Sequence, residues 1–193
     1  MKRLIPLIAV LGLGLTAGAV QAEPQAYEIE KSHTFIAFKI SHIGYAWMPG
    51  VFKEFSGELT YDPENRSNSE VSFTVKTPSV DTFHSERDKH IREKEGLLYT
   101  TEYPKATFES TSYEPTGHDS AILTGDLTIK GKTHEVEFEV EEGKAAEDPW
   151  DNFRRSFTAT GKVNLKEFGI THFEGMDAPK YARLEIAVEA LRK

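Results

Sequence analysis

The residues with the most obvious chemical potential lie between Thr82 and His90, in the segment TFHSERDKH. His84, Asp88 and His90 carry side chains that bind metal ions, and Ser85 beside His84 places a hydroxyl next to a base. On a helix, residues 84 and 88 share one face, whereas residue 90 lies about 120° away from residue 84. No H-x-H or H-E-x-x-H motif accompanies these residues. The spacing therefore predicts no metal site.

The sequence also contains no pattern typical of nucleophilic catalysis. The chain has no cysteine, and no G-x-S-x-G motif places a serine on a strained turn. Ser85 and His84 are neighbours, and adjacent residues of a helix point apart. We therefore predict no catalytic residue, no cofactor and no enzyme, with a barrel enzyme acting on a lipid or a quinone as the less favoured alternative.

Two interpretations of this charged segment remain open at the level of sequence. In one, residues 82–94 form a solvated helix with local ion pairs, in which Glu86 reaches towards His90. In the other, Arg87 and His90, with Phe83 and Ile91 close by, form the polar mouth of an apolar cavity. An arginine there could bind a phosphate with both arms of its fork, or a quinone carbonyl with one.

The N-terminal residues predict the compartment. Met1 to Arg3 form a short basic start, residues 4–15 are an apolar run, and Val20 and Ala22 provide small side chains of an A-x-A-like cleavage site. The apolar run is shorter than the roughly 20 residues that a membrane-spanning helix needs. Residues 1–22 are therefore predicted to be a cleaved signal peptide, which directs residues 23–193 to the periplasm without stable membrane insertion.

The charge of the chain excludes one class of partner. The net charge is −8, and loss of the leader removes two basic residues and no acidic one. So acidic a surface repels phosphate backbones and anionic headgroups, which argues against nucleic-acid binding. Residues 23–193 have the length of one domain, and without disulfides its stability must come from an ordinary core.

Alternation of apolar and polar residues runs through most of the chain and predicts an all-β fold. Turn signals such as Asp62-Pro63 and Lys130-Gly131 separate the runs. Each run has one apolar face, and residues 44–50 are interpreted as a loop. The predicted strands are residues 27–30, 36–40, 52–61, 71–75, 106–113, 122–129, 136–140, 157–165 and 184–190.

Such strands can form either a two-sheet sandwich or a closed barrel. Their length and the inward position of Gly57, Gly125 and Gly161 favour the barrel, because inward glycines relieve crowding where a sheet coils strongly, although simple bulges would also account for them. The chain also contains 12 Phe, 7 Tyr and 2 Trp. These aromatic side chains would either fill a dense core or line the wall of a cavity.

Six motifs in succession resemble the YceI-like family of periplasmic, lipocalin-like proteins. They are HTFIAFKISHIGYAWMPGVFKEFSGELTYD, SVDTFHSERDKH, YPKATFEST, TGDLTIKGKTHEV, EDPW and FGI. The resemblance implies an eight-stranded antiparallel barrel with one short helix in a crossing connection. It also implies an elongated apolar tunnel that holds a long isoprenoid, polyprenyl or quinone-like lipid. Residues 90–104 are more charged than the family pattern, which bears on the length of the ligand.

The expected function is therefore to bind and carry an isoprenoid-type lipid in the periplasm. The alternative is an envelope-stress or structural interaction protein in which the lipid is incidental. The sequence leaves open whether the protein is a monomer or a homodimer. His42 is expected to face the interior, either as a satisfied core histidine or as a ligand contact. The predicted ligand-binding residues are Phe38, Ile40, His42, Trp47, Phe55, Phe73, Val75, Arg87, His90, Phe108, Phe157 and Phe168.

Overall fold

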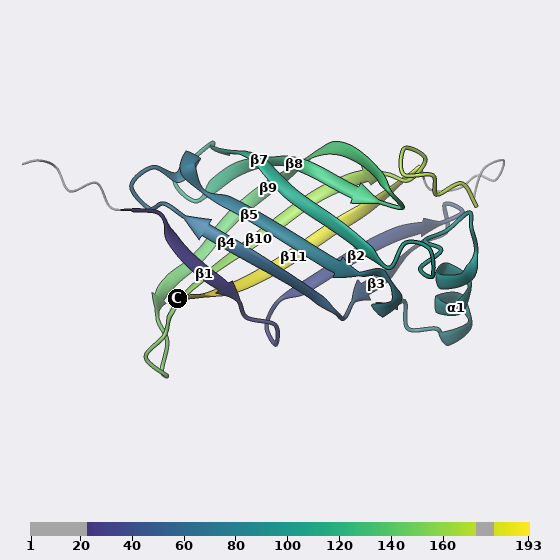
Figure 1. Ribbon diagram of the computed structural model, residues 1–193, viewed down its shortest axis with the longest axis horizontal. Helices are drawn as coiled ribbons and strands as arrows, with labels where there is room; N and C mark the ends of the chain where they lie inside the picture. The colour runs from purple at the N-terminus through teal and green to yellow at the C-terminus, as the bar shows by residue number, and fades with distance from the viewer. Residues whose placement is uncertain (1–22, 173–179) are drawn as a thin grey trace, which may run out of the picture.

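The computed structural model describes residues 23–172 and 180–193. In these residues, one antiparallel sheet coils into an elongated closed barrel, with a single α-helix at one end (Figure 1). The strands are β1 (Gln25–Ile29), β2 (Phe35–His42), β3 (Ala46–Phe52), β4 (Phe55–Tyr61), β5 (Glu70–Lys76), β6 (Val80–Asp81), β7 (Lys105–Pro115), β8 (Ser120–Ile129), β9 (Lys132–Glu147), β10 (Phe153–Asn164) and β11 (Tyr181–Arg192). The helices are η1 (Arg66–Asn68), η2 (Thr77–Ser79) and α1 (Ser85–Glu93).

Closure of the barrel comes from its first and last strands. Within the described residues the ring is formed by eight strands in the order β1, β4, β5, β7, β8, β9, β10 and β11. Tyr27 of β1 pairs with Arg192 of β11, and this contact completes the ring. The prediction of an eight-stranded antiparallel barrel with one short helix is confirmed.

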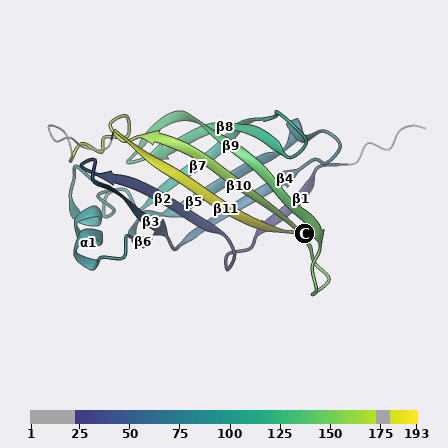
Figure 2. The ribbon, with the colours of Figure 1, turned by 180° about the vertical axis from the view of Figure 1, so that it is seen from behind.

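The remaining three strands lengthen the barrel beyond this ring. β2 pairs with β11 further along the same edge that β1 uses, β3 pairs with β2, and β6 pairs with β3 (Figure 2). The chain therefore breaks at residues 30–34, 53–54 and 77–79 and continues as a second strand each time. One end of the barrel is a complete ring. At the other end, β2, β3 and β6 together with α1 complete the wall beside β8, β10 and β11.

The prediction of one strand over residues 52–61, preceded by a loop, is wrong. β3 already begins at Ala46, and the chain breaks at residues 53–54 before β4 starts. Phe52 and Phe55 are both partly buried although they lie three residues apart, and a strand of period two cannot turn both inward without a break. The amides freed by the break donate to Ser79, since Lys53 N lies 3.2 Å from its carbonyl oxygen and Glu54 N lies 3.0 Å from its Oγ.

The inward glycines lie beneath phenylalanine rings. A Cβ added at Gly125 would lie 2.4 Å from Cζ of Phe108, and one added at Gly161 would lie 2.7 Å from Cδ1 of Phe138. Real Cβ contacts are never that short, so each ring covers the backbone of a neighbouring strand. The glycines thereby keep the aromatic rings close to the wall of the barrel.

Helix α1 contains the charged segment of the sequence, as predicted. Nδ1 of His84, its N-cap, accepts a hydrogen bond from the backbone N–H of Arg87 at 3.2 Å. The carboxylate of Asp88 is buried and accepts from both the backbone N–H (2.8 Å) and the hydroxyl of Thr82. These contacts fix the first turn of α1 to the end of β6.

The predicted signal peptide, residues 1–22, lies outside the described residues and stays a prediction. Within the part of the chain that is described, α1 is too short and too polar to cross a membrane, and no other helix could do so.

Candidate functional site

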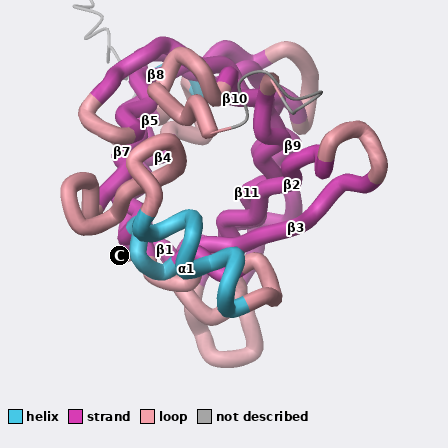
Figure 3. The backbone as a smooth tube through the Cα atoms, turned by 90° about the vertical axis from the view of Figure 1, so that its right-hand side faces the viewer, coloured by secondary structure: helices cyan, strands magenta, loops and turns pink. Residues whose placement is uncertain are grey.

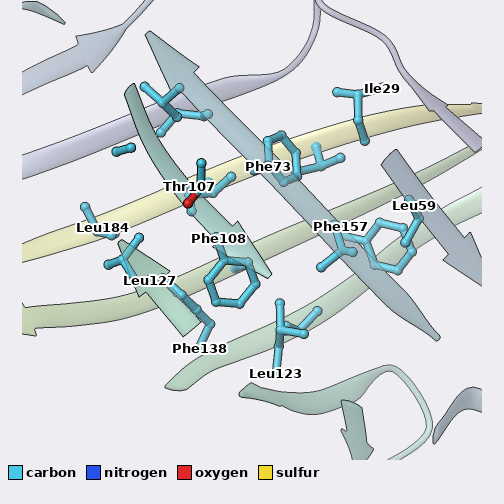
Figure 4. Close-up of a pocket in the computed structure, with 18 of the residues that line it drawn as sticks. Ile29, Leu59, Phe73, Thr107, Phe108, Leu123, Leu127, Phe138, Phe157 and Leu184 are labelled. Carbon is cyan, nitrogen blue, oxygen red and sulfur yellow. The ribbon is translucent and has the colours of Figure 1, made fainter. Parts of the chain in front are cut away.

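An apolar cavity of about 170 Å³ occupies the interior of the closed ring. Figure 4 shows Phe73, Phe108 and Phe157 converging on it from three different strands. Its side chains are almost all aliphatic or aromatic because they come from the inward positions of successive strands. They include Ile29, Ile36, Phe52, Leu59, Tyr61, Val71, Phe73, Val75, Leu98, Phe108, Tyr113, Leu123, Leu127, Ile129, Phe138, Val140, Phe157, Leu184, Ile186 and Val188.

A second cavity, of about 280 Å³, lies at the end of the barrel that carries α1. Figure 3 looks along the molecule from this end, with α1 lying across one side of the strands. Four residues, namely Phe52, Leu98, Ile129 and Leu184, line both cavities, so the two adjoin. The result is one elongated apolar space that runs from the inside of the ring to the helix.

Polar side chains line part of the second cavity, and the exposed ones mark its outer end. Its lining includes Arg87, Thr82, His42, His90 and His172 among otherwise mostly apolar side chains. Arg87 and His90, which one interpretation of the sequence places at the mouth of a cavity, both line this one. His42 and His90 are exposed, which excludes a buried core role for His42.

Arg87 is held in place from two sides. Its Nε donates to Oγ1 of Thr82 at 2.8 Å and its Nη2 donates to the carbonyl oxygen of the same residue. Its Nη1 points across the mouth to Sδ of Met48, at 3.6 Å. A thioether sulfur is a weak acceptor, so the guanidinium offers Nη1 to a better one.

The twelve predicted ligand-binding residues divide into three groups. Phe73, Val75, Phe108 and Phe157 line the inner cavity, whereas Phe38, Ile40, His42, Arg87 and His90 line the outer one. Three residues line neither cavity. Trp47 lies outside the barrel with its ring 3.9 Å from Cζ of Arg183, Phe55 packs against Phe73, and Phe168 is fully buried in the core beside His134.

Leu97 and Leu98, which follow α1, are cavity residues that the sequence analysis did not predict. Leu98 lines both cavities and Leu97 lines the outer one. They belong to an irregular segment in which Leu98 N donates to the carbonyl oxygen of Ile91 and Thr100 N to that of Arg92. Periodicity cannot reveal such positions, and two adjacent leucines in a charged stretch were the one available signal.

A buried polar cluster seals the other end of the inner cavity. The hydroxyls of Tyr61 and Tyr113 donate to Glu142 at 2.7 and 2.6 Å, and Nη2 of Arg66 lies 2.6 Å from the same carboxylate. Burial and, to a smaller extent, the hydrogen bond to Glu142 raise the pKa of Tyr61 to about 12. The same causes raise the pKa of Tyr113. Both phenol rings line the cavity and both hydroxyls are satisfied, so the ring faces offer a ligand only apolar contact.

Among the described residues, His42, His90 and His172 line the outer cavity, but they do not form a group of three whose ligand atoms lie within 4.8 Å of one another. Across residues 23–172 and 180–193, the one group whose ligand atoms lie within 4.8 Å of one another is Glu30, His33 and Glu189, near the break after β1. Arg154 bridges the two carboxylates there, with Nη1 at 3.6 Å from Glu30 and in contact with Glu189. His84 and Asp88, which could have bound a metal, serve the start of α1 instead.

Comparison with known proteins adds the family to this geometry. A family model described as the YceI-like domain matches residues 27–190. The chain belongs to the YceI-like family. The protein YceI of Shigella flexneri is 40% identical over 193 residues, which covers all of both chains.

Solved structures share the fold at low sequence identity. The chain resembles BcnA of Burkholderia cenocepacia with a TM-score of 0.76 and 19% identity, over 83% of this chain and 98% of that one. It also resembles a polyisoprenoid binding domain from Saccharophagus degradans, described as implicated in plant cell wall breakdown. There the TM-score is 0.67 and the identity 13%, over 88% of this chain and 99% of that one.

Proposed function

We propose that the protein binds a long isoprenoid-type lipid, polyprenyl or quinone-like, and carries it through the periplasm without chemical change. The observation that carries this proposal is the pair of adjoining apolar cavities that ends in a cluster of polar side chains. A chain molecule with one polar end matches that distribution. Membership of the YceI-like family and the fold shared with a polyisoprenoid binding domain support it.

The tail of the ligand would supply most of the binding free energy. Burial of one CH₂ group contributes about 0.8 kcal/mol, so a few isoprene units outweigh any single polar contact even after losses of chain entropy. A hydrogen bond from a charged group to the head adds about 1.5–3 kcal/mol. The head would therefore select and orient the ligand at Arg87, while the tail holds it.

The identity of the ligand is tested by solvent extraction of protein purified from its periplasm, followed by mass spectrometry. We expect a long isoprenoid chain with a polar head in stoichiometric amount. Recovery of no lipid, or of a mixture of ordinary fatty acids in trace amounts, would refute the proposal. Conversion of the bound lipid on incubation would instead reveal an enzyme.

The contribution of the head is tested by Arg87→Ala combined with His90→Ala. We expect binding of a polyprenol to weaken by about one to three kcal/mol, because the hydrogen bonds at the mouth are lost. A polyprene hydrocarbon of equal length should bind the variant and the parent alike. Lys89→Ala on the exposed side of α1 serves as the matched control. Equal polyprenol affinity in variant and parent would show that the charged segment is only a solvated helix and does not bind the head of the ligand.

Export is tested separately from binding. We expect the intact mass of the periplasmic protein to correspond to a chain that begins at Glu23, because Val20 and Ala22 fit the signal-peptidase site. Periplasmic protein that retains residues 1–22 would contradict the proposed cleavage.

A further inference from the structure

Three large apolar side chains are exposed around the mouth of the outer cavity. Ile43 is 38% exposed, Tyr45 86% and Phe83 70%. We refer to these three residues as the rim patch. Ile43 and Tyr45 lie in the turn between β2 and β3, where the Tyr45 ring is 6.4 Å from that of His42, and Phe83 follows Thr82. Since His42 and Thr82 both line the outer cavity, the rim patch adjoins its mouth.

Two residues of the rim patch also have an unfavourable backbone conformation. Ile43 has a φ of 50° and Phe83 a φ of 64°, in the left-handed region that suits glycine and asparagine. A β-branched residue such as isoleucine is rare there. Neither the exposed side chains nor these backbone angles stabilise the fold. The stability of the monomer therefore does not explain why large apolar residues occupy positions 43, 45 and 83.

We propose that the rim patch docks reversibly on the surface of a lipid bilayer, so that the lipid passes between bilayer and cavity without crossing water. This inference rests on the proposed lipid-binding function. It extends that function with an interaction surface and with a partner, the membrane that donates or receives the ligand.

The position of the rim patch points to a bilayer as the occupant. Its apolar surface adjoins the apolar cavity through the mouth, so a bilayer against it would give a long tail a path that avoids exposure to water. Aromatic and aliphatic side chains at the tips of a turn and of a helix start can enter the interfacial region of a membrane. Three side chains bury too little surface for stable insertion, so the contact is reversible.

Charge specifies which bilayer is suitable. The chain carries a net charge of −8, which opposes approach to an anionic surface. The docking contact is therefore apolar, and it should favour neutral phospholipids over anionic ones. Added salt should not weaken binding to neutral vesicles, because no attraction between opposite charges supports it.

The variant that tests docking replaces all three residues: Ile43→Asn, Tyr45→Ser and Phe83→Asn. Asparagine tolerates the left-handed backbone at positions 43 and 83, so the melting temperature should be equal to that of the parent or higher. The matched control is Trp150→Ser. Trp150 is 73% exposed in the turn between β9 and β10, at the end of the barrel opposite α1 (Figure 1).

The measurement is flotation of the lipid-free protein with phosphatidylcholine vesicles. We expect the parent and Trp150→Ser to float alike. The triple variant should bind at least about tenfold more weakly, because three apolar side chains no longer enter the bilayer. Failure of the parent to float, equal flotation of the triple variant, or equal loss in Trp150→Ser would each overturn the proposal. The proposal would also be overturned if the parent were a dimer and the triple variant a monomer. The rim patch would then be the contact with a second copy of the chain.

A second measurement separates docking from ligand binding. Farnesol, a short isoprenoid alcohol that disperses in water, should bind the triple variant and the parent with equal affinity, because the rim patch does not line either cavity. Transfer of a labelled polyprenol from vesicles should be slower only for the triple variant. If the parent floats with vesicles but binds no isoprenoid, the proposed function is refuted, whereas docking on the bilayer is still supported. Equal rates of polyprenol transfer would refute the role of docking in loading.

Discussion

Nη1 of Arg87 lies 3.6 Å from Sδ of Met48, and this contact joins α1 to β3 across the mouth of the outer cavity. The other two nitrogens of the guanidinium are bound to Thr82, so Nη1 alone faces a weak acceptor. A carbonyl or phosphate oxygen of a ligand would replace the sulfur at little cost.

Met48→Leu tests this competition. Leucine keeps the volume of methionine and removes the sulfur, so we expect a change in stability below about 1.5 kcal/mol. A polyprenol should bind about two- to fivefold more tightly, because Nη1 is no longer engaged before the ligand arrives. A polyprene hydrocarbon, titrated in parallel, should show no change. Weaker binding of the polyprenol alone would mean that Met48 positions Arg87 instead of competing for it.

Gly50→Ala should shorten the space available to the ligand. A Cβ at this position would lie 2.3 Å from Cζ of Phe38, and its three nearest atoms all belong to that ring, which must move. Phe38 lines the outer cavity, so we expect displacement of its ring to lower the affinity for long polyprenols more than for farnesol. Titration with a series of chain lengths measures this difference.

A second substitution supplies the control for Gly50→Ala. Phe38→Leu in the same chain removes the crowded ring and should restore the affinity for long chains. Uniform loss of affinity at every length, with no rescue by Phe38→Leu, would contradict the steric explanation.

Stability should fall at alkaline pH because of Tyr61. Its pKa is raised from 10.0 to about 12 in the folded protein by burial and by the hydrogen bond to Glu142. Below pH 10 the phenol is neutral in both states and its contribution is complete. Between pH 10 and 12 the unfolded chain loses the proton while the folded chain keeps it, so the free energy of unfolding decreases.

Tyr61→Phe should make that decrease shallower. The variant loses one hydrogen bond, which costs about 0.5–1.5 kcal/mol at neutral pH, since Tyr113 and Arg66 still satisfy Glu142. Denaturant titrations at pH 8 and pH 11.5 provide the comparison. An identical pH dependence in parent and variant would show that Tyr61 does not titrate in this range.

Chelation should leave the melting temperature unchanged. His84 caps α1, Asp88 accepts hydrogen bonds from Thr82, and Arg154 bridges Glu30 and Glu189. These contacts already engage His84, Asp88, Glu30 and Glu189, four of the side chains that could have bound a metal. A large fall in melting temperature with EDTA, restored by zinc, would be inconsistent with that arrangement.

Alternation in the sequence was sufficient to predict most of the strands and some inward positions, whereas the eight-stranded closed barrel was predicted only through the resemblance to the YceI-like family. Phe73, Phe108 and Phe157 lie at inward positions of regular strands, where period two is unambiguous. The strand break at residues 53–54 was missed, although the odd spacing of Phe52 and Phe55 signalled it. Trp47 was misplaced because β3 was interpreted as a loop, and no pattern then indicated which side of the barrel it faces.

Contacts between distant residues could not be predicted from periodicity. Glu142 lies 81 residues from Tyr61 and 76 from Arg66, and only the pairing of the strands brings them together. The outer cavity depends on Leu97 and Leu98 in an irregular segment. Its position follows from the packing of that segment against the end of the barrel, which no local sequence pattern encodes.

The break at residues 77–79 has a consequence for the route that a ligand takes. Past it, β6 pairs only with β3 in the described chain, through Val51 with Asp81 and Phe52 with Val80, and no strand joins it to β7. Past this break, α1 and the residues that follow it form part of the wall of the outer cavity through Arg87, Ile91 and Leu98, and Nη1 of Arg92 holds α1 to β6 by donating to the carbonyl oxygen of Val80 at 3.4 Å. Outward rotation of this wall would leave every hydrogen bond of the eight-stranded ring intact. We therefore expect a ligand with a bulky head to leave sideways at the seam between β6 and β7, without threading its full length through a fixed opening.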